Sequence, residues 1–263
     1  MNLEDGARTS EGTVTPFDDG EIYDRILGGL DYAVDAYVEL ARQAKGPILD
    51  VACGTGRITI PMLQSGAEVE GLDNAPSMLE RLRVKARALG MDPKLHQADM
   101  CDFSLPRRFA IVAITFNAFT NMLTTEMQLA CLRCCREHLA PGGMLVFDGF
   151  FPSQEMVGAP QNTRVLELET RDRETGETLR IYDTRSFDYV RQIQHSINEI
   201  EATSAEGVTR LVQRSEMDGR WTYKFEMELL LRVAGFSRWE IAGGFDRRPL
   251  EKDSDGMVVF AWG

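Results

Sequence analysis

The feature that most constrains the fold is a short apolar run that ends in a glycine-rich turn. Residues 47–52 read Pro-Ile-Leu-Asp-Val-Ala and are followed by Cys53, Gly54, Thr55 and Gly56. Such a run is typical of a buried strand that enters a tight turn. Glycines let the backbone pass close to a ligand, and the helix that follows offers free amide groups. The segment therefore predicts a ligand-binding loop at the end of a strand.

Strands and helices are expected to alternate on either side of this loop. Apolar and β-branched runs indicate further strands at residues 68–72, 94–97, 109–115 and 144–147. Apolar residues at helical spacing indicate helices at residues 22–44, with a break at Gly28-Gly29, and at residues 58–63, 77–89 and 124–138. Strands that alternate with helices in this way form a parallel sheet with helices on both faces. We therefore predict an α/β fold.

Residues 162–217 break this alternation. Segments near Val165, Leu179, Ile193 and Leu211 alternate polar and apolar side chains with a period of two, and turn-rich sequences separate them. This pattern predicts a small antiparallel β insertion, half exposed, after the fifth strand. The exposed face of the insertion is a candidate surface for a homodimer.

The chain is expected to divide into four parts. Residues 1–20 form a flexible acidic segment that lacks the features of a signal peptide, and residues 21–155 form the ligand-binding core. Residues 156–220 hold the insertion, a candidate substrate cap or dimer surface, and residues 221–263 complete the core sheet. This last part contributes a helix that ends at Gly235 and two strands, which brings the predicted main sheet to seven strands.

Charge and composition exclude several kinds of partner. The formal net charge is -12, so the chain has no general attraction to nucleic-acid phosphates or anionic lipid. No apolar stretch approaches the roughly 20 residues that a membrane-spanning helix needs. Five cysteines, an odd number, fit reduced thiols. We therefore expect a cytoplasmic protein whose partner is a small molecule, with no nucleic acid and no membrane.

Two acidic residues follow the strands that come after the glycine loop. Asp73 ends the second strand and Asp99 ends the third. Because the carboxyl ends of parallel strands meet at one edge of a sheet, both side chains should face one crevice. Asp73 can accept hydrogen bonds from both ribose hydroxyls, and Asp99 can accept one from an adenine amino group. Either acid alone is more often a helix cap or a surface charge, but together they indicate a nucleoside site.

A dinucleotide-binding enzyme also places glycines after its first strand, in the pattern G-x-G-x-x-G. Gly54 and Gly56 fit that pattern, but its third position is Thr59. This mismatch and the presence of Asp99 argue against a nicotinamide-dependent reductase.

In this order, residues 50–56, Asp73, Asp99 and residues 139–143 resemble the successive motifs of class I methyltransferases that use S-adenosylmethionine (SAM). The resemblance covers residues 23–151 well and the final helix and strands more loosely. It implies a Rossmann-like, seven-stranded, mostly parallel sheet, with SAM as the cofactor and S-adenosylhomocysteine as its product.

More narrowly, Tyr23-Asp24, Asp31-Tyr32 and the glycine loop are similar to the sugar-amine N,N-dimethyltransferases of antibiotic biosynthesis. Members of that group also carry an antiparallel sheet after the fifth strand. One departure from the wider family is Ala52, which stands where many members have glycine.

The resemblance implies a set of cofactor-binding residues around the strand ends. They are Tyr23, Tyr32, Asp50, Ala52, Cys53, Gly54, Gly56, Asp73, Asn74, Met78, Asp99, Met100 and Phe116. The glycine loop would line the methionine part of SAM, and Asp73 would hold the ribose. Asp99 and Met100 would bracket the adenine. Tyr23 and Tyr32 would close over the cofactor.

The loops after the fourth and fifth strands should face the transferred methyl group. Tyr23, Asn117 and Asp148 are the candidate catalytic residues. Asp148 is the only candidate base, and it can equally orient the acceptor through a hydrogen bond. The candidate substrate residues are Phe119, Asn121, Phe150, Phe151, Arg220 and Tyr223. The alternative is that Phe150 and Phe151 seal the core and that the segment opening the last helix only packs.

The chemistry favours a nitrogen acceptor. Methyl transfer from SAM is an in-line displacement, in which ordering of the reactants can supply about 7–11 kcal/mol. An amine needs only to be unprotonated, whereas a hydroxyl or carbon acid usually needs a base or a metal. The three histidines, His96, His138 and His195, lie outside the motif loops. We therefore predict N-methylation of an amine, for example an amino sugar.

Cys131, Cys134, Cys135 and His138 have a spacing that resembles a zinc site. They share one face of one helix, whereas structural zinc needs ligands that converge tetrahedrally, usually from two segments. We interpret them as buried thiols and predict no metal.

Two other interpretations stay open at the level of sequence. The chain can be an O- or C-methyltransferase of a secondary metabolite, which would need a base. It can also be a SAM-binding module without catalysis, which would bind SAM tightly and turn over no acceptor.

Overall fold

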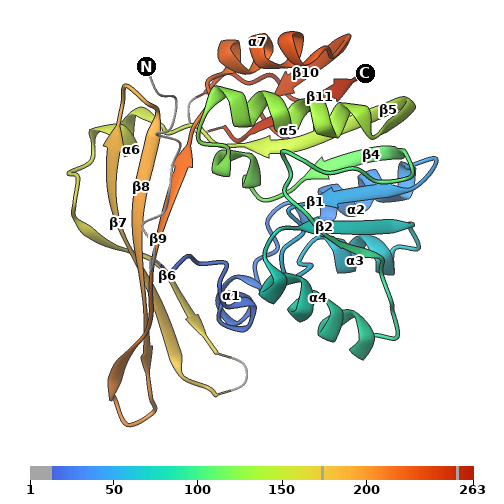
Figure 1. Cartoon of the computed structure of the whole chain (residues 1–263). Helices are drawn as coiled ribbons and strands as arrows, with labels where there is room; N and C mark the ends of the chain where they lie inside the picture. Colours follow the sequence, from blue (N-terminus) through green and yellow to red (C-terminus); the bar gives the residue numbers. More distant parts are fainter. Residues whose placement is uncertain (1–13, 173–174, 253–254) are drawn as a thin grey trace, which may run out of the picture.

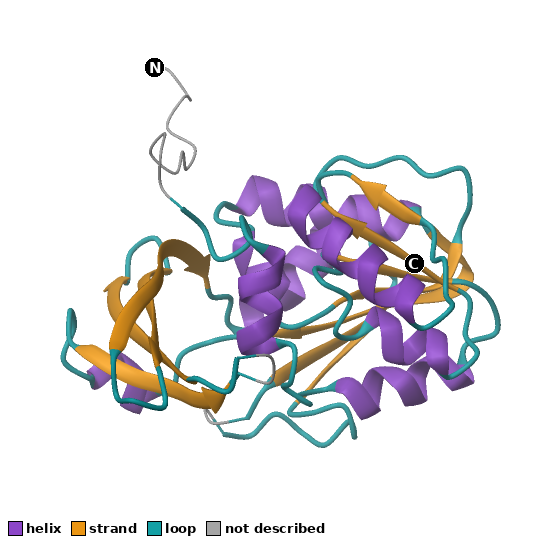
Figure 2. Ribbon diagram, turned by 90° about the horizontal axis from the view of Figure 1, so that it is seen from below, coloured by secondary structure: helices purple, strands orange, loops and turns teal. Residues whose placement is uncertain are grey.

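The computed structural model describes residues 14–172, 175–252 and 255–263. It contains a seven-stranded sheet flanked by helices and a four-stranded antiparallel sheet, with helix α1 (Gly20–Leu27) between them (Figure 1). Seen from below, the antiparallel sheet lies beside the α/β layers (Figure 2). The predicted fold class is therefore confirmed, including the antiparallel insertion after the fifth strand.

The seven-stranded sheet has the order β10-β11-β5-β4-β1-β2-β3. Its strands are β1 (Ile48–Val51), β2 (Val69–Asp73), β3 (Leu95–Gln97), β4 (Phe109–Ile114), β5 (Leu139–Gly149), β10 (Arg238–Ala242) and β11 (Met257–Trp262). β11 is antiparallel to both of its neighbours, and the other pairs are parallel. Because β1 lies between β2 and β4, the sheet has a topological switch point beside β1, where open α/β sheets bind ligands.

Helices cover both faces of this sheet. They are α2 (Val34–Gln43), α3 (Thr59–Gln64), α4 (Pro76–Ala88), α5 (Thr125–Glu137) and α7 (Lys224–Ala234). Successive β1 side chains point to opposite faces: Ile48 packs with Tyr37 of α2, and Leu49 packs with Leu132 of α5. The apolar run of β1 is therefore buried on both sides, as its sequence predicts.

The antiparallel sheet has the order β6-β7-β8-β9. Its strands are β6 (Arg164–Arg171), β7 (Thr178–Asp188), β8 (Ile193–Thr203) and β9 (Thr209–Arg220). A short helix, α6 (Gln154–Gly158), precedes it, and a 3-10 helix, η1 (Ala118–Asn121), contacts β9 from the core. One face of this sheet therefore looks towards the carboxyl edge of the main sheet.

Strand β5 begins earlier than the sequence suggests. The sequence indicates a strand at residues 144–147, but Leu139 already pairs with Phe109. The next pair in the ladder joins Met144 to Ile111, so the residues between them bulge out of the ladder. Gly142, with φ of 75°, permits this irregularity.

The N-terminal segment was expected to be flexible as far as residue 20, and its first 13 residues lie outside the described part of the chain. Hydrogen bonds join the described remainder to strand β9 and to helix α4. The amide of Glu216 in β9 donates to the Val14 carbonyl at 2.9 Å, and the Ser77 hydroxyl in α4 donates to the Phe17 carbonyl at 2.8 Å. Asp19 then caps helix α1.

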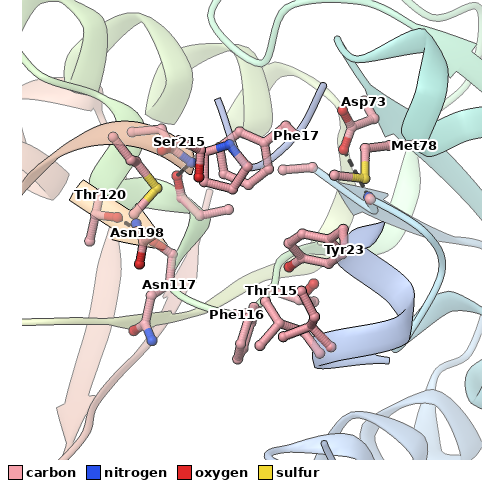
Figure 3. A pocket seen from close by; sticks show the side chains of 18 of the residues that line it. Phe17, Tyr23, Asp73, Met78, Thr115, Phe116, Asn117, Thr120, Asn198 and Ser215 are labelled. Atoms are coloured by element: carbon pink, nitrogen blue, oxygen red, sulfur yellow. Dashed lines mark hydrogen bonds between the residues drawn. The ribbon is translucent and has the colours of Figure 1, made fainter. Parts of the chain in front are cut away.

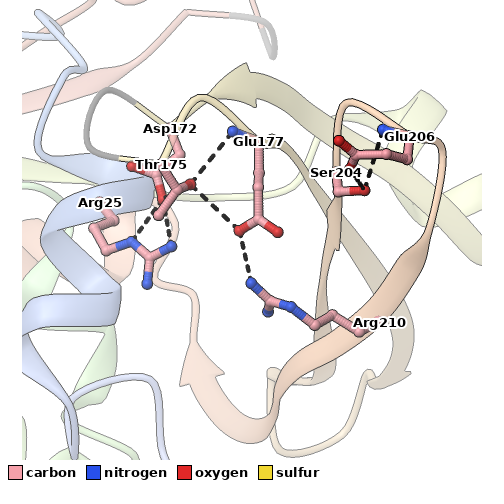
Figure 4. Close-up of polar contacts among 7 residues, drawn as sticks. All are labelled: Arg25, Asp172, Thr175, Glu177, Ser204, Glu206 and Arg210. Carbon is pink, nitrogen blue, oxygen red and sulfur yellow. Dashed lines mark hydrogen bonds and ion pairs between the residues drawn. The ribbon is translucent and has the colours of Figure 1, made fainter.

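Helix α1 is fixed to both halves of the molecule. Asp24 accepts a hydrogen bond from Thr55 in the glycine loop at 2.9 Å and pairs with Lys85 of α4 at 2.6 Å. On the other side, Arg25 pairs with Asp172 beside the end of β6 (Figure 4). The helix thus closes one wall of the space between the two sheets. Among the described residues, no helix is long and apolar enough to cross a membrane.

Candidate functional site

The carboxyl ends of the central strands open into a cavity of about 860 Å³. Strand ends, helix α1 and the antiparallel sheet all contribute to its lining. Figure 3 shows Asp73 and Met78 at one end, Asn198 and Ser215 at the other, and Tyr23 between them. This volume lies within the usual range for small-molecule sites, about 300–1,000 Å³.

The glycine loop at the end of β1 bends sharply. Ala52, Gly54 and Gly56 all have positive φ, at 57°, 54° and 83°. Gly54 lines the cavity, and a Cβ atom added there would meet nothing within 4 Å. A Cβ atom at Gly56 would lie 2.6 Å from Leu82 Cγ. The two glycines therefore serve different purposes: Gly54 keeps the cavity open, and Gly56 lets α4 pack closely.

Asp73 holds the glycine loop in place. Its Oδ2 accepts from the Gly54 amide at 2.8 Å, and its Oδ1 accepts from the Ala75 amide at 2.9 Å. Burial raises the pKa of Asp73, and these backbone donors counteract the rise. The carboxylate still lines the cavity, and each of its oxygens keeps a free lone pair. It can therefore accept further hydrogen bonds from a ligand.

The expected adenine-binding residues lie together near Asp73. Asn74, Met78, Asp99 and Met100 all line the cavity. Asp99 is exposed, and its Oδ1 accepts from the Cys101 amide at 2.8 Å. Asn74 follows β2, Met78 lies in the first turn of α4, and Asp99 and Met100 follow β3, which is the neighbour of β2 in the sheet. The structure thus brings together the nucleoside-binding set that the resemblance implies.

Asp50 does not reach the cavity. It is fully buried, and it accepts hydrogen bonds from the Thr59 hydroxyl at 2.6 Å and the Thr115 hydroxyl at 3.3 Å. Burial raises the pKa of Asp50 to about 7. Asp50 therefore supports the loop from below rather than lining the ligand space. Likewise, the described residues that line the cavity do not include Cys53 or Gly56. Cys53 is buried against α4.

Asp148 lies behind the loop that follows β4. It is 1% exposed and accepts from the Tyr37 hydroxyl at 2.8 Å and from the amides of Phe116 at 3.1 Å and Asn117 at 2.7 Å. Phe116 and Asn117 both have positive φ, near 57°, a strained conformation for non-glycine residues. Asp148 is not among the described lining residues, so this geometry differs from both roles expected for it, a base and a direct orienter of the acceptor: the carboxylate holds the Phe116–Asn117 turn, and both turn residues line the cavity.

The two tyrosines expected over the cofactor occupy different environments. Tyr23 in α1 lines the cavity beside Phe17, with ring centroids 6.2 Å apart, and burial raises its pKa to about 12. Tyr32 is 44% exposed and lies outside the described lining, although its ring is 6.2 Å from that of Phe116. Tyr23 therefore faces the ligand space, and Tyr32 lies at its margin.

Arg57 is a residue that the sequence analysis missed. Its Nη1 donates to the carbonyls of Leu30 and Tyr32 at 3.1 and 2.8 Å, and its guanidinium lies 4.1 Å from the Phe116 ring centroid. Its Nη2 is buried without a partner. A buried donor of this kind is normally satisfied, so Nη2 fits an anionic group entering beside the glycine loop. The sequence did offer a signal for this residue, because Arg57 is a cationic side chain directly after the glycine turn.

The expected substrate residues separate into two groups. Asn121 lines the cavity, and its amide nitrogen donates to the Ala118 carbonyl at 3.1 Å. Phe119 does not line it, because its ring is 2% exposed and packs 5.0 Å from Phe147 in the core. Arg220 pairs with Glu226 at 2.8 Å and so joins β9 to α7.

The aromatic pair after β5 and the residue before α7 also lie elsewhere. Phe150 and Phe151 are not among the described lining residues. Phe151 packs against the core and lies 6.1 Å from the exposed ring of Tyr223. For Phe151, the alternative interpretation, that it seals the core, therefore fits the structure better.

The antiparallel sheet supplies a wall of the cavity that the sequence analysis left without residues. Its lining side chains come from all four strands and are Glu167, Leu168, Ile181, Asp183, Arg185, Asn198, Ile200, Gln213, Ser215 and Met217. On β7, β8 and β9 they alternate along the strand, as one face of a sheet requires. Period-two alternation in the sequence identifies such a face but does not say which face turns inward.

The cysteine-rich face of α5 belongs to the core. Cys131 and Cys135 are fully buried. His138 contacts the Cys134 carbonyl through Nδ1 at 2.7 Å and the Leu105 amide through Nε2 at 2.9 Å, so both ring nitrogens are engaged by the backbone. These contacts support the interpretation as packed thiols.

Comparison with known proteins identifies the same region. A family described as a methyltransferase domain matches residues 48–143. The chain is 31% identical over 196 residues to dTDP-3-amino-3,4,6-trideoxy-alpha-D-glucopyranose N,N-dimethyltransferase of Streptomyces venezuelae, which covers 72% of this chain and 74% of the relative. It is 29% identical over 245 residues to dTDP-3-amino-3,6-dideoxy-alpha-D-glucopyranose N,N-dimethyltransferase of Streptomyces fradiae. That match covers 88% of this chain and 88% of the relative.

A solved structure has the same overall fold. The CcbJ methyltransferase from Streptomyces caelestis superposes with a TM-score of 0.75 and 26% identity, over 95% of this chain and 98% of that one. The likeness thus extends beyond the matched domain to the antiparallel sheet.

The two loop glycines give a matched pair of variants. Gly54→Ala is expected to weaken binding of S-adenosylhomocysteine roughly tenfold or more, about 1.4 kcal/mol, because the new methyl group occupies cavity space. Gly56→Ala is expected to lower the free energy of unfolding by about 1–3 kcal/mol, because its Cβ atom collides with Leu82. Isothermal titration calorimetry and chemical denaturation of both variants test this division.

Both substitutions add a methyl group at a positive φ, so backbone strain is a shared cost. The difference between the variants therefore reports on the location of each glycine. Wild-type affinity in folded Gly54→Ala would show that the cofactor does not approach this loop.

The buried carboxyl of Asp50 predicts a pH dependence of stability. Its folded pKa of about 7 exceeds the ordinary value near 4, so between these values the folded state holds a proton that the unfolded state has released. Stability from this group therefore falls as pH rises through that window. Asp50→Asn removes the titration, so its stability relative to wild type should rise between about pH 4 and pH 7.

Chemical denaturation across that pH range measures the effect. Asp92→Asn, at an exposed position remote from the loop, is the matched control and should follow the wild type. Parallel pH profiles for Asp50→Asn and the wild type would contradict a buried, titrating Asp50.

Proposed function

Because the chain belongs to the SAM-dependent methyltransferases and acts on a small molecule, we propose that it methylates the nitrogen of an amine, such as an amino sugar. The observation that carries this proposal is the neutral character of the polar groups near the middle of the cavity. Tyr23 stays protonated at neutral pH because its pKa is about 12, and Thr115 and Asn117 do not titrate. Asp148 lies behind them, engaged by three donors. A neutral amine needs no strong base.

The residues at the nucleoside end of the cavity fit SAM. Asp73 would hold the ribose, and Asp99 would accept from the adenine amino group. The unpartnered Nη2 of Arg57 would pair with the carboxylate of the methionine part. When bound, SAM supplies a methyl group on a sulfonium, whose departure leaves a neutral thioether.

The chain itself would act mainly by positioning. Helix α1 lies against the glycine loop through Asp24 and would exclude water from it. The rings of Phe17, Tyr23 and Phe116 line the cavity, where aromatic faces can stabilise positive charge. Asn117, which lines the cavity, would accept a hydrogen bond from the amine and so aim its lone pair. Ordering of this kind can supply about 7–11 kcal/mol.

The direct test is turnover with SAM on a panel of acceptors that contains amino sugars and other primary amines, together with phenols and carboxylic acids. Mass spectrometry should show one or two added methyl groups on an amine nitrogen, and activity should survive excess chelator. Methylation confined to oxygen or carbon would contradict the proposal, and tight SAM binding with no turnover would favour a binding module.

Asp73→Asn tests the nucleoside site. The substitution keeps the shape but removes a charged acceptor, and charge-assisted hydrogen bonds contribute about 1.5–3 kcal/mol each. We expect the KM for SAM to rise roughly ten- to hundredfold, with a smaller change in kcat. Asp92→Asn makes the same charge change at an exposed position and should leave KM unchanged. An unaltered KM in Asp73→Asn would remove this residue from the site.

A further inference from the structure

Three polar side chains form a row across the antiparallel wall of the cavity. Asp183 of β7 pairs with Asn198 of β8, which pairs with Ser215 of β9. Paired residues on adjacent strands share a face, with Cβ atoms about 5 Å apart. All three residues line the cavity. We call Asp183, Asn198 and Ser215 the polar row.

Two members of the polar row carry buried atoms without a partner. Asp183 is 5% exposed; its Oδ2 accepts from Arg185 Nε at 2.5 Å and from the Ser196 hydroxyl at 3.3 Å, while Oδ1 has no partner. Ser215 is 1% exposed, and its hydroxyl also lacks a partner. Buried polar atoms are normally satisfied. Because both residues line a cavity, a ligand can supply the missing partners.

The polar row lies away from the nucleoside end. Figure 3 shows Asn198 and Ser215 across the cavity from Asp73 and Met78, with Tyr23 between the two groups. If SAM lies on the glycine loop, the polar row faces the acceptor. It offers a carboxylate oxygen, which can only accept, and an amide and a hydroxyl, which can both donate and accept. A molecule that binds all three therefore carries a hydrogen-bond donor for Asp183.

The charge of this wall is negative. Among the described lining residues, Arg185 is the only cation. It contacts both Asp183, at 2.5 Å, and Glu167, at 2.9 Å. Two carboxylates therefore share one guanidinium, and the group keeps a formal charge of minus one when all three are ionised. A ligand cation would be attracted here, and a ligand anion would be repelled.

A nucleoside diphosphate requires the opposite environment. Proteins bind phosphate through free arginine or lysine side chains or through helix N-termini. The two curated relatives act, by their names, on amino sugars that carry a dTDP group. At the acceptor end of this cavity, the one described cation is already bound by two carboxylates.

We propose that the acceptor is a neutral or cationic small molecule whose hydroxyl or ammonium groups bind Asp183 and Ser215, and that it is not linked to a nucleoside diphosphate. This inference rests on the proposed function and narrows its substrate class. It distinguishes the chain from the dTDP-sugar enzymes to which it is similar.

A matched pair of probes tests the proposal. Methyl 3-amino-3,6-dideoxy-α-D-glucopyranoside and dTDP-3-amino-3,6-dideoxy-α-D-glucopyranose differ only in the group on the anomeric carbon. Binding of each to protein saturated with S-adenosylhomocysteine is measured by calorimetry, and kcat/KM is measured with SAM. We expect the methyl glycoside to bind at least roughly tenfold more tightly than the dTDP sugar.

Two variants connect that preference to the polar row. Asp183→Asn should weaken glycoside binding roughly tenfold or more and leave the KM for SAM unchanged. Glu199→Gln makes the same charge change on the outward face of β8, where Glu199 pairs with Arg164 at 2.7 Å, and should match the wild type. Preference for the dTDP sugar, or equal glycoside affinity in Asp183→Asn and wild type, overturns the proposal.

Binding and turnover separate this inference from the proposed function. One possible result is that the glycoside binds, that Asp183→Asn abolishes this binding, and that no amine is methylated. This result would support the polar row as a binding site and would contradict amine N-methylation. If neither probe binds at millimolar concentration while another amine is methylated, the polar-row inference is overturned and the proposed function stands.

Discussion

The hydrogen bond from the Gly54 amide to Asp73 is the contact on which the site depends. It joins the loop after β1 to the end of β2 at 2.8 Å, so the two elements that would hold a nucleoside are fixed relative to each other. Asp50 supports the same loop from below through Thr59. Asp24 ties α1 to it through Thr55. Three carboxylates thus hold this loop in the shape that leaves Gly54 open to the cavity.

The second half of the molecule determines what can reach that loop. Helix α1 packs Ile26 against Leu179 and Ile200 of the antiparallel sheet and pairs Arg25 with Asp172. The insertion is thereby held against the core, and its inward face becomes a wall of the cavity. In the proposed function the main sheet would supply the cofactor site, and the insertion would supply the groups that select an acceptor.

The sequence predicts the cofactor end well because that end is built from strand termini. Gly54 follows β1, Asp73 ends β2 and Asp99 follows β3, and parallel strands bring their carboxyl ends together whatever their side chains contact. Side-chain direction was harder to predict. Asp148 lies near the end of β5 and Phe119 follows β4, yet packing turns the first towards a backbone turn and the second into the core.

The acceptor wall could not be read from the sequence for a different reason. Asp183 and Ser215 are polar, and a polar position in an alternating strand normally indicates the solvent face. Here these residues face a cavity between two sheets, and their pairing partner Asn198 lies on a third strand. Only strand register places them together. Phe17 was missed for a related reason. Nothing in the polar N-terminal segment predicts that Phe17 accepts a hydrogen bond from Ser77 of α4 or that Val14 accepts one from β9.

The position of the cofactor is the central claim, and a crystal structure of the protein with S-adenosylhomocysteine tests it most directly. The ribose hydroxyls should lie within hydrogen-bonding distance of Asp73, with the adenine beside Met78 and Asp99 and the amino-acid carboxylate at Arg57. A ligand bound elsewhere, or crystals that take up none under saturating conditions, would contradict it.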